Sequence, residues 1–227
     1  MTIEMDASLL RPLVRQRLIL GGVLLALGIS LGVTIALAAG NAPLPVDRGW
    51  MDEMLTIRTS VLLGFGYAMN WIGGGWFSVV GLPVIILALL WLRGHRWGAV
   101  FFAVSALVSV GVVQVLKRSF ERPRPLEILT ASDAGSFPSG HTANAATIAV
   151  VLFIIFPRVW VAIAGAVWVL LMAFSRTLMG AHWASDTVGG ALIGAGVVLL
   201  VAAAFAVPLS RERMLLPKPR DQELPAR

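Results

Sequence analysis

Charged residues are unevenly spaced along this chain and leave six long uncharged stretches between them. The stretches cover residues 18–46, 59–92, 97–116, 134–157, 159–175 and 187–210. A helix that crosses a membrane needs roughly 17–25 predominantly apolar residues, so each stretch can hold one such helix. The pattern therefore predicts an all-α, polytopic membrane protein with six transmembrane helices.

Six helices are expected at residues 18–39, 76–92, 97–116, 142–156, 159–174 and 182–207. Between the first two, residues 50–71 place small or polar residues at helical spacing among bulky apolar ones. This pattern is typical of an amphipathic helix in the membrane interface, although it also fits the first half of a long tilted span. In the last helix, Gly190 and Gly194 form a small-xxx-small pair that predicts close helix packing.

The two ends of the chain are polar, which defines three parts. Residues 1–17 form an N-terminal segment, residues 18–207 form one membrane domain, and the proline-rich and charged residues 208–227 are expected to be a disordered tail. The first helix ends in a sequence that could pass for a signal-peptide cleavage site. It is longer than the usual core of about 7–15 residues, so a retained helix is the favoured interpretation.

Composition excludes several classes of protein. Of the 227 residues, 58% are hydrophobic and 13% are charged, whereas soluble domains have about 45–50% apolar and about 25% charged residues. A soluble globular enzyme and a disordered protein are therefore excluded. The chain has no cysteine and only three histidines, so thiolate chemistry is excluded and a histidine-rich metal site is difficult to build. We expect no metal and no other cofactor.

The formal net charge is +6, and a positive charge of this size has two interpretations. Basic proteins often bind nucleic acid, but cytoplasmic loops of membrane proteins also collect Lys and Arg. With a cytoplasmic N-terminus and six spans, most of the 18 Lys and Arg residues fall on the cytoplasmic side. We therefore expect both termini in the cytoplasm and no nucleic-acid partner.

Polar and ionisable residues gather at four predicted helix ends that share the outer face. Ionisable residues at membrane depth indicate a functional site. Each group taken alone has a structural explanation, such as a snorkelling lysine or an i,i+4 pair, and Arg118 and Arg122 are expected to be ordinary interface cations. The groups are Lys117 and Arg124, then Ser139, Gly140 and His141, then Ser175 and Arg176, and finally His182 and Asp186.

The residue types indicate phosphate chemistry. A lysine and two arginines around one cavity suit a phosphate dianion, and arginine adds bidentate geometry. Ser139 occupies the expected N-cap of the fourth span, which leaves the backbone N–H groups of Gly140 and His141 to face an anion. The lysine and the two arginines would also stabilise the charge of a transition state without a metal.

The two histidines have different expected roles. His182 and Asp186 are four residues apart on a helix, so the carboxylate can bind one ring nitrogen and leave the other as an aligned nucleophile or base. His141 remains as a separate acid–base group that can protonate a leaving oxygen.

Three segments of the chain resemble the three-part signature of the type 2 phosphatidic acid phosphatase superfamily, which also includes the vanadium haloperoxidases. All eleven fixed positions are present, in the order and at the spacings of that family. The segments are Lys117-x6-Arg124-Pro125, Pro138-Ser139-Gly140-His141 and Ser175-Arg176-x5-His182-x3-Asp186.

The resemblance implies a role for each site residue. His182 attacks phosphorus and forms a phosphohistidine, Asp186 orients His182, and His141 protonates the leaving group. The phosphate is held by Lys117, Arg124, Ser139, Gly140 and Arg176.

By the same resemblance, the protein is an integral phosphatase of lipid phosphates in a bacterial inner membrane, with its site facing outward. The implied substrates are undecaprenyl diphosphate, phosphatidylglycerophosphate or phosphatidic acid. An outward-facing site favours undecaprenyl diphosphate, since it suits recycling of a carrier lipid. The alternatives are a vanadate-dependent haloperoxidase, whose relatives are larger and soluble, and a non-enzymatic transporter or scaffold.

Overall fold

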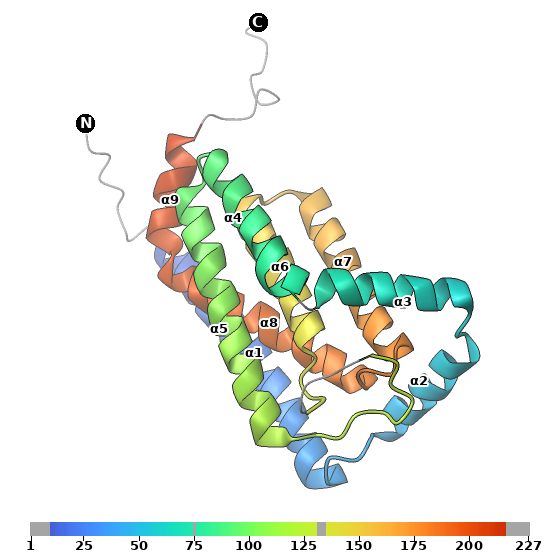
Figure 1. The fold of residues 1–227 in the computed structure, drawn as a ribbon. Helices are drawn as coiled ribbons and strands as arrows, with labels where there is room; N and C mark the ends of the chain where they lie inside the picture. The colour runs from blue at the N-terminus through green and yellow to red at the C-terminus, as the bar shows by residue number, and fades with distance from the viewer. Residues whose placement is uncertain (1–9, 75, 131–134, 217–227) are drawn as a thin grey trace, which may run out of the picture.

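A computed structural model describes residues 10–74, 76–130 and 135–216 of the chain. These residues form nine α-helices and a π-helical segment without any β-strand, which confirms the predicted helical class (Figure 1). The α-helices are α1 (Arg11–Ala39), α2 (Pro45–Thr56), α3 (Ser60–Gly73), α4 (Leu82–Leu92), α5 (Arg96–Phe120), α6 (Gly140–Ile155), α7 (Val159–Leu178), α8 (Ala184–Ala204) and α9 (Ala206–Leu215).

Four helices are long and apolar enough to cross a membrane, namely α1, α5, α7 and α8. Helices α4 and α6 are also apolar but have only 11 and 16 residues. At about 1.5 Å per residue, α6 is about 24 Å long, which is less than the roughly 30 Å hydrocarbon core. Four of the six predicted spans thus have the expected length, and the other two remain a prediction.

The region between the first two predicted spans differs from the expectation. The prediction of a single amphipathic helix over residues 50–71 is wrong, because the chain forms two helices, α2 and α3, with a break between them. The break is stabilised locally, since the side chain of Thr59 accepts a hydrogen bond from the backbone N–H of Leu62 and so caps α3. Helix α3 runs across the direction of the long helices (Figure 1).

The C-terminal region also differs from the expectation. The prediction of a disordered tail from residue 208 onward is wrong up to Leu215, because residues 206–215 form the helix α9. The carboxylate of the buried Glu212 accepts hydrogen bonds from the backbone N–H groups of Trp97, at 2.5 Å, and Gly98, at 3.0 Å. Helix α9 is thus fixed by capping the N-terminus of α5. Residues 217–227 lie outside the described part of the chain.

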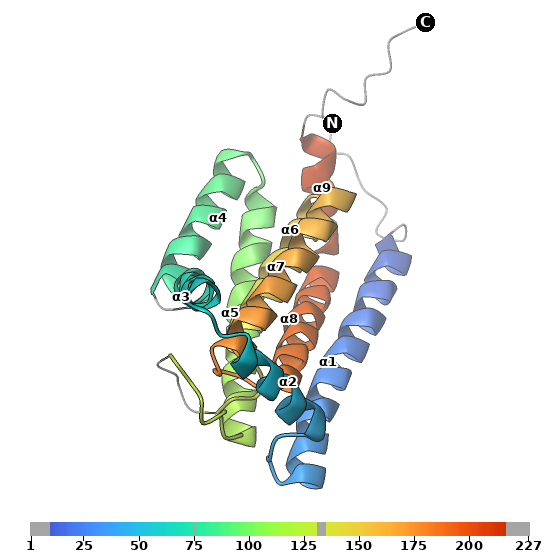
Figure 2. The ribbon, with the colours of Figure 1, turned by 90° about the vertical axis from the view of Figure 1, so that its right-hand side faces the viewer.

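Helix α8 lies between α1 and α6 (Figure 2) and packs closely against both. A Cβ atom added at Gly190 would lie 2.4 Å from the carbonyl oxygen of Ser139, and one added at Gly194 would lie 2.4 Å from that of Ala143. The predicted close packing at these glycines is therefore confirmed. This close packing brings the first turns of α6 and α8 together, and the backbone N–H of Ser139 donates to the backbone carbonyl of Asp186 at 2.9 Å.

Candidate active site

A cavity of about 590 Å³ lies where α5 and α7 end and α6 and α8 begin. Six of the predicted site residues line it, so the structure brings together groups that are far apart in the sequence. Ser139 and Asp186 lie behind the wall of the cavity. The six lining residues are Lys117, Arg124, Gly140, His141, Arg176 and His182.

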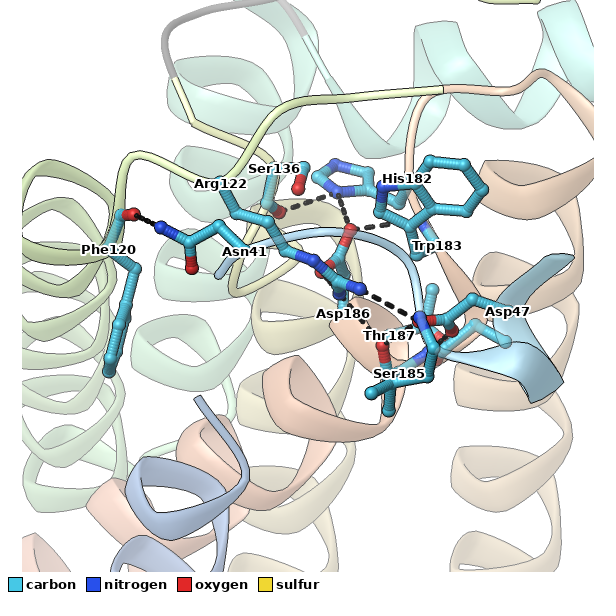
Figure 3. Close-up of polar contacts among 12 residues, drawn as sticks. Asn41, Asp47, Phe120, Arg122, Ser136, His182, Trp183, Ser185, Asp186 and Thr187 are labelled. Carbon is cyan, nitrogen blue, oxygen red and sulfur yellow. Dashed lines mark hydrogen bonds and ion pairs between the residues drawn. The ribbon is translucent and has the colours of Figure 1, made fainter. Parts of the chain in front are cut away.

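The imidazole of His182 is held by two different groups (Figure 3). Its Nδ1 atom lies 2.8 Å from the carbonyl oxygen of Ser136 and 3.6 Å from Oδ2 of Asp186. Because a carbonyl oxygen can only accept a hydrogen bond, Nδ1 carries the proton. The lone pair of Nε2 then faces Arg124, whose Nη1 is 3.3 Å away. The direct acceptor is therefore the Ser136 carbonyl, and the Asp186 carboxylate is an electrostatic contact behind it.

Burial keeps His182 neutral. Its side chain is only 3% exposed, and burial lowers its pKa from about 6.5 to about 4. The carboxylate of Asp186 opposes this pKa shift, whereas the positive charges of Arg124 and Lys117 add to it. An imidazole that is neutral near pH 7, with an unprotonated Nε2, can act as a nucleophile.

Lys117 and Arg124 converge on one backbone carbonyl. The Nζ atom of Lys117 donates to the carbonyl of Gly135 at 3.0 Å, and Nη2 of Arg124 donates to the same oxygen at 2.9 Å. Gly135 has φ +69°, and a Cβ there would lie 2.8 Å from the Lys117 carbonyl oxygen, so glycine is needed at this position. The carbonyl thereby gathers both cations at the cavity.

Arg176 connects the cavity to α3. It is 1% exposed, and its Nη1 donates to Oδ1 of Asn70 at 2.6 Å and lies 3.3 Å from Nε2 of His141. Asn70 thus holds the guanidinium beside the second histidine. This role could not be predicted from the sequence, where Asn70 is one amide among the polar positions of residues 50–71.

Ser139 is the predicted N-cap of α6. Its hydroxyl oxygen lies 3.5 Å from the backbone nitrogen of Thr142 and accepts from the Thr142 hydroxyl at 3.2 Å. The side chain is fully buried, so its hydroxyl serves the helix terminus. Gly140 lines the cavity, where the N-terminus of α6 favours an anion. A direct role for Ser139 in holding phosphate stays a prediction.

Arg122 is not an interface cation, which corrects the expectation. The side chain is 1% exposed, and its Nη1 lies 2.6 Å from Oδ1 of Asp186 while its Nη2 lies 2.8 Å from Oδ2 of Asp47 (Figure 3). Asp47 also accepts from the N–H and hydroxyl of Ser185, at 2.9 and 2.8 Å. Two buried carboxylates draw the guanidinium inward, away from the membrane interface.

This network fixes the catalytic carboxylate predicted from the sequence. Asp186 is held by Arg122 on one oxygen and by the backbone N–H of Trp183, at 2.8 Å, on the other. The second oxygen also faces His182. Asp47, Arg122 and Asp186 therefore form a buried charge network, and its member from α2 gave no distinguishing signal in the sequence.

Known proteins that resemble this chain are phosphatases. Residues 98–207 match the PAP2 superfamily. The chain is 30% identical over 192 residues to the lipid A 1-phosphatase of Rhizobium johnstonii, covering 75% of this chain and 72% of that protein. It is also 30% identical to an undecaprenyl-diphosphatase of Sulfolobus acidocaldarius, covering 53% of this chain and 61% of that protein.

The fold also has a solved counterpart, a transmembrane PAP2-type phosphatidylglycerolphosphate phosphatase from Bacillus subtilis. The TM-score is 0.72 at 25% identity, covering 83% of this chain and 96% of that one. Apolar helices and membrane phosphatase relatives together indicate a membrane protein. The chain therefore belongs to the PAP2 superfamily, whose lipid phosphatases are hydrolases of phosphate esters.

Proposed function

We propose that this protein is an integral membrane phosphatase that acts through a phosphohistidine on a lipid phosphate, with undecaprenyl diphosphate as its substrate. One observation carries the proposal. A neutral, buried His182 and a second histidine, His141, share one cavity with Lys117, Arg124 and Arg176. Nucleophile, acid–base group and anion-binding cations are the parts that phosphoryl transfer to a histidine requires.

The cavity suits a lipid because its lining includes apolar residues of two neighbouring helices besides the cations. These residues are Pro83 and Leu87 of α4 and Phe102, Ala106 and Val110 of α5. A phosphate can then bind the cations while its hydrocarbon chain lies between two membrane helices. The relative from S. acidocaldarius, an undecaprenyl-diphosphatase, supports a prenyl diphosphate.

In the first step, Nε2 of His182 attacks the terminal phosphorus. The N–P bond forms as the bond from phosphorus to the leaving oxygen breaks, and the electron pair stays on that oxygen. His141 donates a proton to it, since the negative charge of the bound phosphate favours the protonated imidazole. The charge that develops on phosphate oxygens is stabilised by the arginines and the lysine.

In the second step, water replaces His182 on phosphorus. His141, now neutral, accepts a proton from the water as the oxygen attacks, and the N–P bond breaks. The electron pair returns to Nε2, orthophosphate leaves, and both histidines regain their starting states. The Ser136 carbonyl and Asp186 keep the His182 ring in the same orientation through both steps.

We also propose six membrane spans, with α4 and α6 completing the four longer helices. The ends of α5 and α7 and the starts of α6 and α8 share the cavity, which supports helices that alternate in direction. The distribution of Lys and Arg favours cytoplasmic termini. The catalytic cavity then faces outward from a bacterial inner membrane.

A second candidate substrate is a lipid A 1-phosphate. It is favoured by the relative from R. johnstonii, which carries that activity in its name and aligns over 75% of this chain. A panel in liposomes that compares undecaprenyl diphosphate, lipid A, phosphatidylglycerophosphate and phosphatidic acid separates the candidates. Preference for either glycerolipid or for lipid A would overturn the substrate that we propose.

The mechanism is tested by separating the two histidines. His182→Ala abolishes turnover of every substrate, because no N–P bond can form. His141→Ala lowers turnover of a lipid phosphate monoester such as phosphatidic acid, whose leaving group is a poor alkoxide, by about 10²–10⁴-fold, the usual size of general acid–base catalysis. With p-nitrophenyl phosphate the leaving group needs less protonation, so the variant still forms the phosphoenzyme, which accumulates when water attack is slow.

The third histidine provides a matched control. His95 lies at the N-cap of α5, at the other end of that helix from Lys117, so His95→Ala keeps both activities. Equal losses of His141→Ala on the lipid monoester and the aryl ester, without an acid-labile phosphoenzyme, would contradict the proposed roles.

A further inference from the structure

A second cavity, of about 680 Å³, lies against a different face of α4. Its walls are Leu82 and Ile86 of α4, Ile148 and Leu152 of α6, and Trp168 of α7. It shares no described lining residue with the catalytic cavity. We call this second cavity the α4–α7 groove.

The charged residues among the described lining of the α4–α7 groove are two arginines, and both lie at one end. Arg93 follows α4 and Arg158 precedes α7. Both loops lie at the end of the bundle near α9 (Figure 1). Since α6 runs from His141 at its start to this end, about 24 Å separate the arginines from His141.

These arginines differ from those of the catalytic site. Arg122 and Arg176 are buried with several polar partners. Arg93 and Arg158 are exposed, and in the described part of the chain neither side chain has a hydrogen bond or ion pair. Two exposed cations from separate loops therefore lie beside an apolar groove without a side-chain partner among the described residues.

We propose that the α4–α7 groove binds an anionic phospholipid, whose phosphate lies between Arg93 and Arg158 and whose acyl chain follows α4, α6 and α7. Basic pockets between membrane helices recognise anionic headgroups, and each cation near the surface strengthens binding about fivefold. The apolar walls suit a hydrocarbon chain, and the volume lies within the roughly 300–1,000 Å³ of ligand sites. The site lies in the leaflet opposite to the one that holds His141 and His182.

The floor of the groove is built from small residues. Ala149, Ala164 and Gly165 line it, and a Cβ added at Gly165 would lie 2.9 Å from Cβ of Ala149. Helices α6 and α7 therefore approach closely, and the space above their contact stays open toward α4. The occupant is distinct from the catalytic substrate, because a phosphate beside Arg158 is about one helix length from His182.

The test measures lipid binding to the purified full chain by native mass spectrometry. Phosphatidylglycerol is the probe, since it has no terminal phosphate monoester for the catalytic site, and phosphatidylcholine with the same acyl chains is the neutral comparison. We expect the double variant Arg93→Gln/Arg158→Gln to bind phosphatidylglycerol about 30-fold more weakly, which is about 2 kcal/mol at 1.4 kcal/mol per tenfold. Its binding of phosphatidylcholine stays unchanged.

A matched control removes the same charge from the same end of the molecule. Arg96 and Arg211 do not line the groove, so Arg96→Gln/Arg211→Gln keeps phosphatidylglycerol binding within about threefold of the unchanged protein. Ala164→Trp, which fills the groove from an exposed position, weakens the binding of both lipids.

Three outcomes would overturn the proposal. Equal losses in the two arginine pairs would assign the effect to general surface charge. Equal binding of the two lipids by the unchanged protein would exclude headgroup recognition. A changed oligomeric state in Ala164→Trp, with lipid binding retained, would assign the groove to a second copy of the chain.

Discussion

Replacing Arg122 by glutamine tests how the carboxylate of Asp186 is held. The guanidinium is 1% exposed and contacts Asp186 at 2.6 Å and Asp47 at 2.8 Å. Arg122→Gln removes the positive charge between two carboxylates that are themselves fully buried. Breaking a buried ion pair by removing one partner costs about 3–5 kcal/mol, so we expect a loss of stability in that range.

Turnover should fall as well, because Asp186 loses the partner that fixes one of its oxygens. Removing the carboxylate of a catalytic triad lowers kcat by about 10⁴-fold. Arg122→Gln keeps the carboxylate but leaves it less well fixed, so we expect a smaller loss of about 10²-fold in kcat. KM should change little, because Arg122 does not line the cavity.

Asp47→Asn separates the two contacts of the guanidinium. The pair between Arg122 and Asp186 survives in this variant, so we expect a smaller loss of turnover than with Arg122→Gln. Because the residues touch, the double variant should depart from additivity by about 0.5–3 kcal/mol. Additive effects of the two substitutions would contradict a shared network.

The assays are thermal unfolding in detergent and phosphate release from a lipid phosphate. Arg118→Gln is the matched control, because Arg118 is an exposed cation near the same helix end. It should match the unchanged protein in both assays. If Arg122→Gln keeps its melting temperature and stays within tenfold of the unchanged kcat, the positioning role is refuted.

Three further predictions address the site and the membrane orientation. The pKa of His182 is lowered to about 4, so the neutral imidazole prevails above that pH. The acidic limb of the pH profile of kcat/KM for phosphoenzyme formation should therefore lie near pH 4, and a limb near pH 6.5 would contradict this shift. Arg176→Ala should lower kcat by about 10²–10³-fold, as expected for one lost transition-state contact, and the unchanged enzyme should keep its activity in excess EDTA. In intact cells, an impermeant thiol reagent should label a cysteine introduced at Leu126, which is 94% exposed, and not one at Arg211; the reverse pattern would invert the proposed topology.

Helix positions and the motif residues could be predicted because both leave direct traces in the sequence. Uncharged stretches mark the apolar helices, and alternating helices bring their motif-bearing ends to one side. The cavity lined by Lys117, Arg124, His141, Arg176 and His182 follows from these two facts.

The network behind the site could not be predicted in this way. An arginine at a helix end looks the same whether it faces lipid headgroups or two buried carboxylates, and Arg122 does the latter. Its pairing with Asp47 depends on how α2 folds back over the bundle. The acceptor for His182 is the backbone carbonyl of Ser136, and a backbone group leaves no trace in residue identity.

Local stabilisation explains the misplaced helix boundaries. The N-cap at Thr59 begins a new helix, α3, inside residues 50–71, whose pattern predicted one amphipathic helix. Glu212 stabilises α9 through a contact with α5, and such tertiary contacts override the polar composition of that segment.

The contacts that support the site also limit how this enzyme can be recombined with its relatives. Asp47 in α2, Asn70 in α3 and Glu212 in α9 all lie outside residues 98–207, the part that matches the family. A chimera that exchanges only residues 98–207 would transfer every motif residue but leave Arg122, Arg176 and Gly98 facing partners from another protein. Exchanging α2, α3 and α9 together with that segment keeps these pairs matched.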